Sequence, residues 1–200
     1  MVEFRNAWSR GRYVVSLVLL AGLGVGCARA PQPDPAEGDE AQMAELTLTS
    51  TAFDHQSPIP EVHSQDGQNT SPPLVWSGVP KEAQELVLIV DDPDAPMAEP
   101  YVHWVLYGMA PDTDRLAKGV PKHPTLTAPE GARQGMNTAG KVGYDGPAPP
   151  PGHGIHHYHF KLYAVDRPLG LKPKQTKADV LRAMKGHVIA QGEFVGTYER

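Results

Sequence analysis

The sequence predicts a mainly β protein, and three observations carry that prediction. Strand-like segments recur from residue 46 onward, and only one segment has a clear helical pattern. Proline and glycine are abundant, with 21 and 20 residues in a chain of 200. Both residue types disfavour helix interiors, so we expect strands joined by many turns and long loops.

The first 27 residues are predicted to be a secretory signal. Arg5, Arg10 and Arg12 precede an apolar run over residues 13–25, which is the arrangement of a signal peptide. The run is short for a membrane span, which needs about 20 apolar residues. Cys27, the only cysteine, ends the run directly after Gly26 and resembles the lipidated cysteine of a bacterial lipobox. We therefore expect an exported chain that is lipid-anchored through Cys27 in the bacterial cell envelope, facing the periplasm or on the outer membrane; the alternative is a soluble secreted protein.

Residues 28–43 are predicted to form a disordered tether between the anchor and a domain over residues 44–200. The segment is rich in proline and acidic residues and has almost no apolar bulk. Such a composition cannot bury enough surface to fold. A single cysteine also means that the chain forms no internal disulfide.

The domain contains five segments with strand patterns. Residues 46–51 alternate between leucine or serine and threonine, and residues 85–90 form a short apolar run that suits a buried strand. Residues 103–109 resemble that run, residues 156–165 are aromatic and alternating, and residues 188–198 complete the set.

One helix is predicted after Thr176, which is a suitable N-cap with Asp179 three residues on. Val180, Leu181 and Met184 give it a partial apolar face, and Gly186 is suited to its end. The stretch over residues 116–151 has little periodicity, so we expect it to be functional or poorly ordered.

Three carboxylates crowd the end of the predicted strand over residues 85–90. Asp91, Asp92 and Asp94 follow it directly. They read either as a strand-ending turn with solvated acids or as a site in which one acid turns inward to accept a hydrogen bond from a histidine or a ligand. His103 opens the next strand, where a lone histidine is more often structural than ligand-binding.

The strand over residues 156–165 has two different faces. Because side chains alternate along a strand, His156, Tyr158, Phe160 and Leu162 share one face, which leads from a polar mouth to an apolar floor. A pocket is lined in this way, with apolar walls and a few aimed polar groups. The remaining residues, His157, His159, Lys161 and Tyr163, form the wetter face.

Together these motifs closely resemble the phosphatidylethanolamine-binding protein family, in its bacterial Raf-kinase-inhibitor-like branch. The resemblance covers residues 46–198, and its motifs are Asn69-Thr70-Ser71-Pro72-Pro73-Leu74 with Trp76, Asp92-Pro93-Asp94-Ala95-Pro96, His103-Trp104, Gly143-Tyr144-Asp145-Gly146-Pro147 and residues 149–158. It implies an antiparallel β-sandwich with one or two peripheral helices and a small anion pocket near one end.

The resemblance also implies the residues of that pocket. Asp92, His103, His156 and Tyr158 match its lining, and Tyr101 stands where many members have a tryptophan at the rim. His157 stands where many members have an arginine. A carboxylate beside a histidine favours the charged ring, so we expect two cationic histidines and a neutral Tyr158 hydroxyl to donate to a phosphate.

We therefore expect a binding protein, not an enzyme, for a phosphate-bearing anion or a phospholipid head group, with no cofactor. A kinase or protease inhibitor-like role is an expectation by analogy, as is a homodimer. The formal net charge of −5 excludes a general nucleic-acid binder, which needs a basic face.

Two alternatives remain open at this point. A metal site or metalloenzyme could use His153, His156, His157 and His159, although strand alternation separates His156 from the last two. A hydrolase could use an Asp/His pair, although the sequence has no Gly-x-Ser-x-Gly motif.

Overall fold

The computed structural model describes residues 43–200. The predictions for the signal, for Cys27 and for residues 28–42 lie outside the described residues. Within the described part there are eleven strands, one α-helix and one short 3-10 helix. They are β1 (Ala44–Glu45), β2 (Thr47–Thr49), β3 (Ser57–Pro58), η1 (Glu61–His63), β4 (Leu74–Ser77), β5 (Glu85–Asp92), β6 (Tyr101–Met109), β7 (Arg115–Leu116), β8 (Thr125–Thr127), β9 (Glu130–Gln134), β10 (His156–Val165), α1 (Lys177–Met184) and β11 (Val188–Tyr198).

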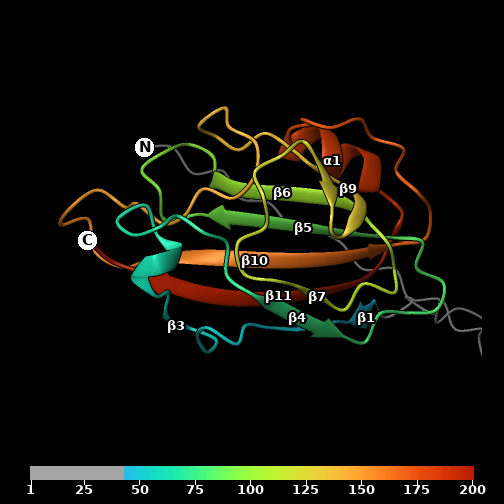
Figure 1. The fold of residues 1–200 in the computed structure, drawn as a ribbon, viewed down its shortest axis with the longest axis horizontal. Helices are drawn as coiled ribbons and strands as arrows, with labels where there is room; N and C mark the ends of the chain where they lie inside the picture. The colour runs from blue at the N-terminus through green and yellow to red at the C-terminus, as the bar shows by residue number, and fades with distance from the viewer. Residues whose placement is uncertain (1–42) are drawn as a thin grey trace, which may run out of the picture. The chain divides into compact units, whose positions relative to one another are not determined.

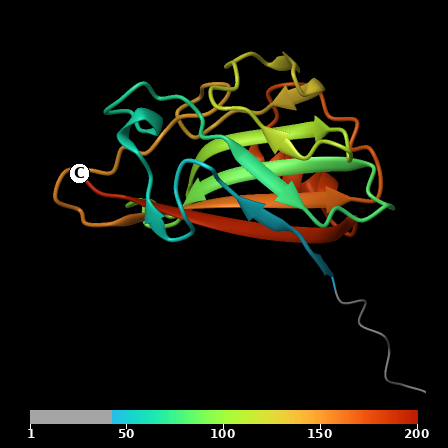
Figure 2. The same cartoon turned by 60° about the horizontal axis from the view of Figure 1, so that its bottom comes forward.

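The strands of residues 43–200 form two sheets (Figure 1). The larger has eight strands in the order β1-β11-β10-β5-β6-β9-β8, with β3 also paired to β11, and the smaller has the order β2-β4-β7. The smaller sheet lies across one face of the larger (Figure 2). The mainly β sandwich is therefore confirmed. It is antiparallel except where the short strands β1 and β3 run parallel to β11.

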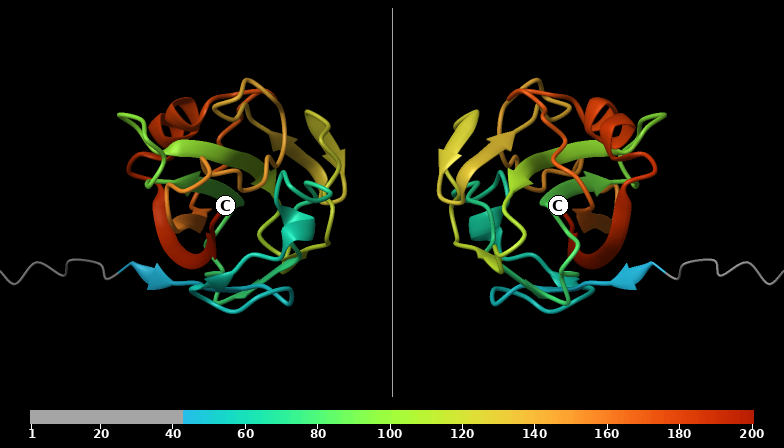
Figure 3. Two further views of the ribbon diagram at one scale, coloured as in Figure 1. Left: turned by 90° about the vertical axis from the view of Figure 1, so that its left-hand side faces the viewer. Right: turned by 90° about the vertical axis from the view of Figure 1, so that its right-hand side faces the viewer.

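Strand β5 is central because both of its faces are buried. Leu86, Leu88 and Val90 pack in the core between the two sheets. Val87 and Ile89 point the other way and pack with residues of α1. Viewed along the strands, α1 and the smaller sheet lie on opposite sides of the large sheet (Figure 3). This double burial explains why the run over residues 85–90 is apolar without alternation.

Helix α1 begins as predicted. The Thr176 side chain accepts from the backbone N–H of Asp179, and the Asp179 carboxylate accepts from the backbone N–H of Thr176. Val180 and Met184 are buried, whereas Leu181 is 40% exposed, so its assignment to the apolar face is wrong. No helix within residues 43–200 is long and apolar enough to cross a bilayer.

The stretch over residues 116–151 has few strands but is well anchored. Besides β8 and β9, it carries the buried polar residues Gln134, Asn137 and Asp145. Their side chains make hydrogen bonds, such as Trp104 Nε1 to Gln134 Oε1 at 2.7 Å. The hydrogen bonds of these buried polar side chains therefore stabilise the stretch, although its sequence has no regular apolar pattern.

Candidate functional site

The predicted pocket residues meet where three strand ends lie together. Strand β5 runs antiparallel to both β6 and β10, so its end lies beside the starts of those two strands. The register places Asp92 opposite Tyr101. A cavity of about 330 Å³ opens there, lined by Gln65, Asp92, Ala95, Pro96, Met97, Tyr101, His103, Ala148, Pro149, Pro150, His156 and Tyr158. All five residues predicted to bind ligand line this cavity.

Asp92 turns inward and accepts a hydrogen bond from a histidine. Its Oδ2 lies 2.7 Å from Nδ1 of His156, and both residues are buried, with 3% and 1% of their surface exposed. The other oxygen, Oδ1, accepts from the backbone N–H of Asp94 at 2.8 Å. Nε2 of His156 in turn lies 2.8 Å from Nδ1 of His153. The reading of the three acids as a solvated turn is therefore wrong for Asp92.

His103 is held by the backbone of a loop that is distant in sequence. Its Nδ1 donates to the carbonyl oxygen of Asp145 over 2.6 Å. Its ring centroid lies 4.8 Å from that of Tyr101 and 5.0 Å from that of Tyr158. Burial lowers the pKa of His103, and this outweighs the opposing effects of the Asp145 carbonyl and the nearby carboxylates. This direction favours a neutral ring over the cationic donor that was expected at His103.

The hydroxyl of Tyr158 is buried without a hydrogen-bond partner among residues 43–200. The backbone of Ala148 approaches it but makes no hydrogen bond of normal geometry. Burial, and then the charge of Asp92, raises the pKa of Tyr158, so the phenol keeps its proton. An unpaired buried hydroxyl costs about 1–3 kcal/mol. A molecule in the cavity that accepts from Tyr158 would recover this free energy.

Sequence reasoning missed two residues that brace the cavity. The Asn69 side chain donates to Asp145 Oδ1 at 2.9 Å and accepts from the backbone N–H of Gly146 at 2.8 Å. This fixes the loop whose carbonyl positions His103. Both Asn69 and Asp145 lie within the family motifs, and these motifs could have indicated that the two residues matter for the cavity. Their contact could not be predicted, because the two residues are 76 positions apart in the sequence. Gln65 and Met97 also line the cavity, and nothing in their local sequence indicated it.

The remaining histidines of β10 lie on the opposite face of the strand. His157 Nδ1 lies 2.7 Å from Asp94 Oδ2, and His159 Nδ1 lies 2.8 Å from Glu193 Oε1. The exposed fractions of the His157 and Asp94 side chains are 48% and 40%. Within residues 43–200 no three histidine, cysteine or acidic side chains are arranged to hold a metal ion.

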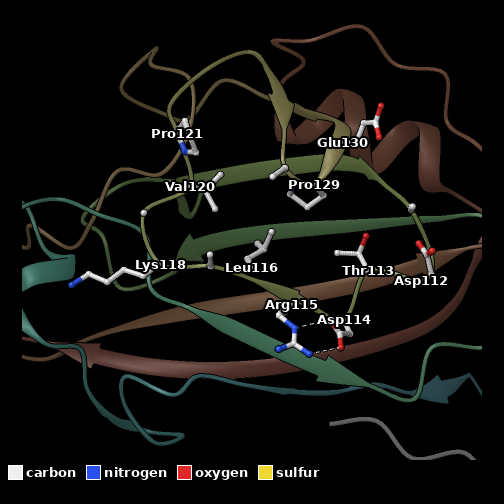
Figure 4. Close-up of a pocket in the computed structure, with 14 residues that line it drawn as sticks. Asp112, Thr113, Asp114, Arg115, Leu116, Lys118, Val120, Pro121, Pro129 and Glu130 are labelled. Atoms are coloured by element: carbon white, nitrogen blue, oxygen red, sulfur yellow. Dashed lines mark hydrogen bonds and ion pairs between the residues drawn. The ribbon is translucent and has the colours of Figure 1, made fainter.

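A larger hollow, of about 770 Å³, lies elsewhere and has different chemistry (Figure 4). Its walls come from the segment around β7 and from the turn between β8 and β9, with Leu116 and Val120 among its apolar residues. Arg115 pairs with its chain neighbour Asp114 at 2.8 Å, and both are exposed. The one buried side-chain polar atom without a partner in the described chain is Tyr158 Oη, so the smaller cavity is the better candidate.

A β-sandwich with a small cavity at one end, where a few polar groups stand among apolar walls, is typical of a ligand-binding protein. The chain belongs to the phosphatidylethanolamine-binding protein family, because the family model of that description matches residues 49–199. A UPF0098 protein of Pyrococcus abyssi is 40% identical over 189 residues, covering 94% of this chain and 99% of its own. A lipoprotein candidate of Mycobacterium tuberculosis, LppC, is 41% identical over 154 residues, covering 77% of this chain and 72% of its own.

The fold has a close match among solved structures. A crystal structure from Chlamydia trachomatis, described as a phosphatidylethanolamine-binding protein homologue, is similar to this chain with a TM-score of 0.70 and 42% identity. The match covers 78% of this chain and 98% of that one. The family and its β fold, predicted from the sequence motifs, are therefore confirmed.

Proposed function

We propose that this protein binds a phosphate-bearing anion, free or as a phospholipid head group, in the cavity at the ends of β5, β6 and β10. The observation that carries the proposal is the Tyr158 hydroxyl, which is buried against the cavity without a partner among residues 43–200. Its neighbours are polar and preorganised, because Asp92 orients His156 and the Asp145 carbonyl orients His103. The name of the family points to the same class of ligand.

Calorimetric titration of the full-length chain with methyl phosphate tests the proposal. Tyr158→Phe removes the donor and keeps the ring. A hydrogen bond to a charged group contributes about 1.5–3 kcal/mol, so the variant should bind about 10- to 100-fold more weakly. Tyr163→Phe is the matched control, since Tyr163 lies on the same strand but outside the cavity. Its affinity should stay within about twofold of the wild type.

Two results would contradict the proposal. One is a wild-type chain that binds no phosphate-bearing ligand between pH 5 and 8. The other is a Tyr158→Phe variant that binds as tightly as the Tyr163→Phe control.

We also propose that the chain is exported and lipid-anchored through Cys27. The support is the position of Cys27 after a basic and apolar segment, together with the relative named as a lipoprotein candidate. Replacing Cys27 by serine should move the protein from the membrane to the soluble fraction. An unchanged membrane fraction with unchanged processing would exclude the anchor.

The binding role that we propose is not catalytic. The buried polar groups of the cavity position a ligand, and no nucleophile with an adjacent base is part of the proposal. Inhibition of a kinase or protease and homodimer formation stay predictions, because no contact within residues 43–200 bears on them.

A further inference from the structure

The cavity presents an unexpected hydrogen-bond acceptor at His103. A carbonyl oxygen can only accept, so the 2.6 Å contact with Asp145 places the ring proton on Nδ1. Because burial also lowers the pKa of His103, the ring is neutral near pH 7 and Nε2 carries a lone pair. Within residues 43–200 this atom forms no hydrogen bond, and His103 lines the cavity, so Nε2 can accept from a molecule there.

The carboxylates around His103 raise the pKa of the ring, and the effect of burial outweighs theirs. Asp92 and Asp91 act on the ring from β5, and Asp145 acts on it from the loop before β10. Tyr101 of β6 and Tyr158 of β10 contact it as neutral phenols. Lys141 Nζ lies 3.5 Å from the Asp145 carboxylate, and Lys122 also acts on that carboxylate.

Asp92 is a second acceptor beside the same cavity. Each of its oxygens already accepts one hydrogen bond, from Asp94 N–H and from His156 Nδ1. A carboxylate offers about four lone-pair positions, so Asp92 can accept again from a ligand. An anion without hydrogens would therefore meet two sets of lone pairs, and the Tyr158 hydroxyl would be its main donor.

Phosphoryl groups differ in whether they can satisfy such acceptors. A phosphomonoester has its second pKa near 6, so below that pH it keeps one P–OH. Sulfate and phosphodiesters have the same tetrahedral shape but no hydrogen on the central group at neutral pH. A cavity with one free donor, Tyr158 Oη, and two acceptors, His103 Nε2 and Asp92, should therefore favour the protonated monoester over sulfate and phosphodiesters.

We propose that the pocket selects a phosphoryl group that carries one proton, with its P–OH donating to His103 Nε2 and its P–O⁻ accepting from Tyr158 Oη. This rests on the proposed function and narrows it to phosphomonoesters. A free monoester and the monoester head group of phosphatidic acid share this chemistry, whereas the diester of phosphatidylethanolamine lacks it.

Calorimetry on the full-length chain at pH 6 and pH 8 tests the selection. At pH 6, methyl phosphate should bind about 10- to 100-fold more tightly than sulfate or dimethyl phosphate, because either of these leaves a buried acceptor unpaired. Between pH 6 and pH 8 the protonated fraction of a monoester falls from about one half to about one hundredth, so its affinity should fall about 50-fold. Dihexanoyl phosphatidic acid against dihexanoyl phosphatidylethanolamine tests the lipid source in the same way.

The outcomes separate this inference from the proposed function. Equal affinities for methyl phosphate, dimethyl phosphate and sulfate would overturn the selection and leave phosphate binding intact, as would equal affinities for the two lipids. A monoester that binds better at pH 8 than at pH 6 would also overturn it. A chain that binds none of these ligands would overturn both proposals.

A second measurement examines His103 without a ligand. Nitrogen chemical shifts of the ring at pH 7 should identify a protonated Nδ1 and an unprotonated Nε2. A doubly protonated ring at that pH would remove the acceptor and overturn the inference.

Discussion

Asp91 and Asp92 are neighbours on β5, almost equally buried, and they have opposite roles. Asp91 is 1% exposed and turns toward α1, where Lys161 Nζ donates to it at 3.0 Å and Lys177 Nζ makes a second ion pair. Asp92 is 3% exposed and turns into the sandwich, where its ring partner is His156. The two carboxylates differ in partners rather than in depth.

The difference explains which acid holds the fold and which acid is available to a ligand. Burial raises the pKa of Asp91, but the hydrogen bonds and charges of Lys177 and Lys161 together lower it by more, so the net shift is downward. Two ammonium groups on different elements thereby join α1 and β10 to β5. Asp92 has one imidazole and one backbone N–H and keeps acceptor capacity beside a cavity.

The largest effect should come from Asp91→Ala. Removing one partner of a buried ion pair costs about 3–5 kcal/mol, and we expect about 2–3 kcal/mol because the lysine ends remain partly in water. Urea denaturation measures this loss of unfolding free energy. Methyl phosphate affinity should stay within about twofold, since the site lies on the other face. A stable variant with lost affinity would reverse the roles that we assign.

Asp92→Asn should have the opposite profile. We expect a loss of about 1 kcal/mol in unfolding free energy, because the amide keeps one acceptor and the shape. Methyl phosphate affinity should fall about tenfold, since one of the two acceptors that favour a protonated phosphoryl group becomes a donor. Sulfate affinity should not fall with it. If both anions lose affinity equally, Asp92 acts only by orienting His156.

The two faces should also respond to acid in different pH ranges. Burial lowers the pKa of His103, and likewise that of His63, below the ordinary value of 6.5. The folded state therefore binds these protons less readily, so the stability that the rings contribute is complete above pH 6.5 and is lost as the pH falls through their folded pKa values. The contribution of Asp91 is present above 3.8 and is lost below it.

Urea midpoints measured from pH 8 to pH 3 can separate these ranges. His103→Gln should flatten the decline just below pH 6.5, whereas Asp91→Ala should preserve that decline and remove part of the one near pH 4. A wild-type midpoint that is constant from pH 7 to pH 5 would contradict the assignment of neutral buried histidines.

The smallest effect should come from Asp94→Ala, the third acid of the same motif. Its partner is His157, and both side chains are well exposed. Exposed pairs contribute about 0–1 kcal/mol, so the denaturation midpoint should hardly move. A loss as large as that of Asp91→Ala would mean that the loop over residues 93–100 depends on this pair.

The sequence predicts the strands of this protein better than the contacts between them. The strands β10 and β11 have the predicted bounds, and β5 and β6 extend the predicted runs by two residues each. Their patterns follow from burial on one or both faces, which is a local property. Short strands such as β7 and β8 have too few residues for a period, so they were not predicted.

The pocket residues were predicted through the family motifs, but their chemistry was not. The carbonyl of Asp145 sets the tautomer of His103 across 42 residues of sequence. Neither the burial of that ring nor the unpaired Tyr158 hydroxyl can be inferred from residue type or spacing. Both depend on how loops from different parts of the chain close over the cavity.

The parallel pairing of β1 with β11 fixes the end of the large sheet at which the described chain begins. Ala44 lies beside Ala190, which is opposite Ala164 near the end of β10, whereas His156 opens that strand at the pocket. Eight residue steps of about 3.3 Å separate the two levels, or about 26 Å. Figure 2 shows β1 and the pocket end of β10 at opposite ends of the large sheet. Residue 44 and the pocket therefore lie at opposite ends of the large sheet, so the lipid anchor that we propose would join the domain at the end away from the pocket.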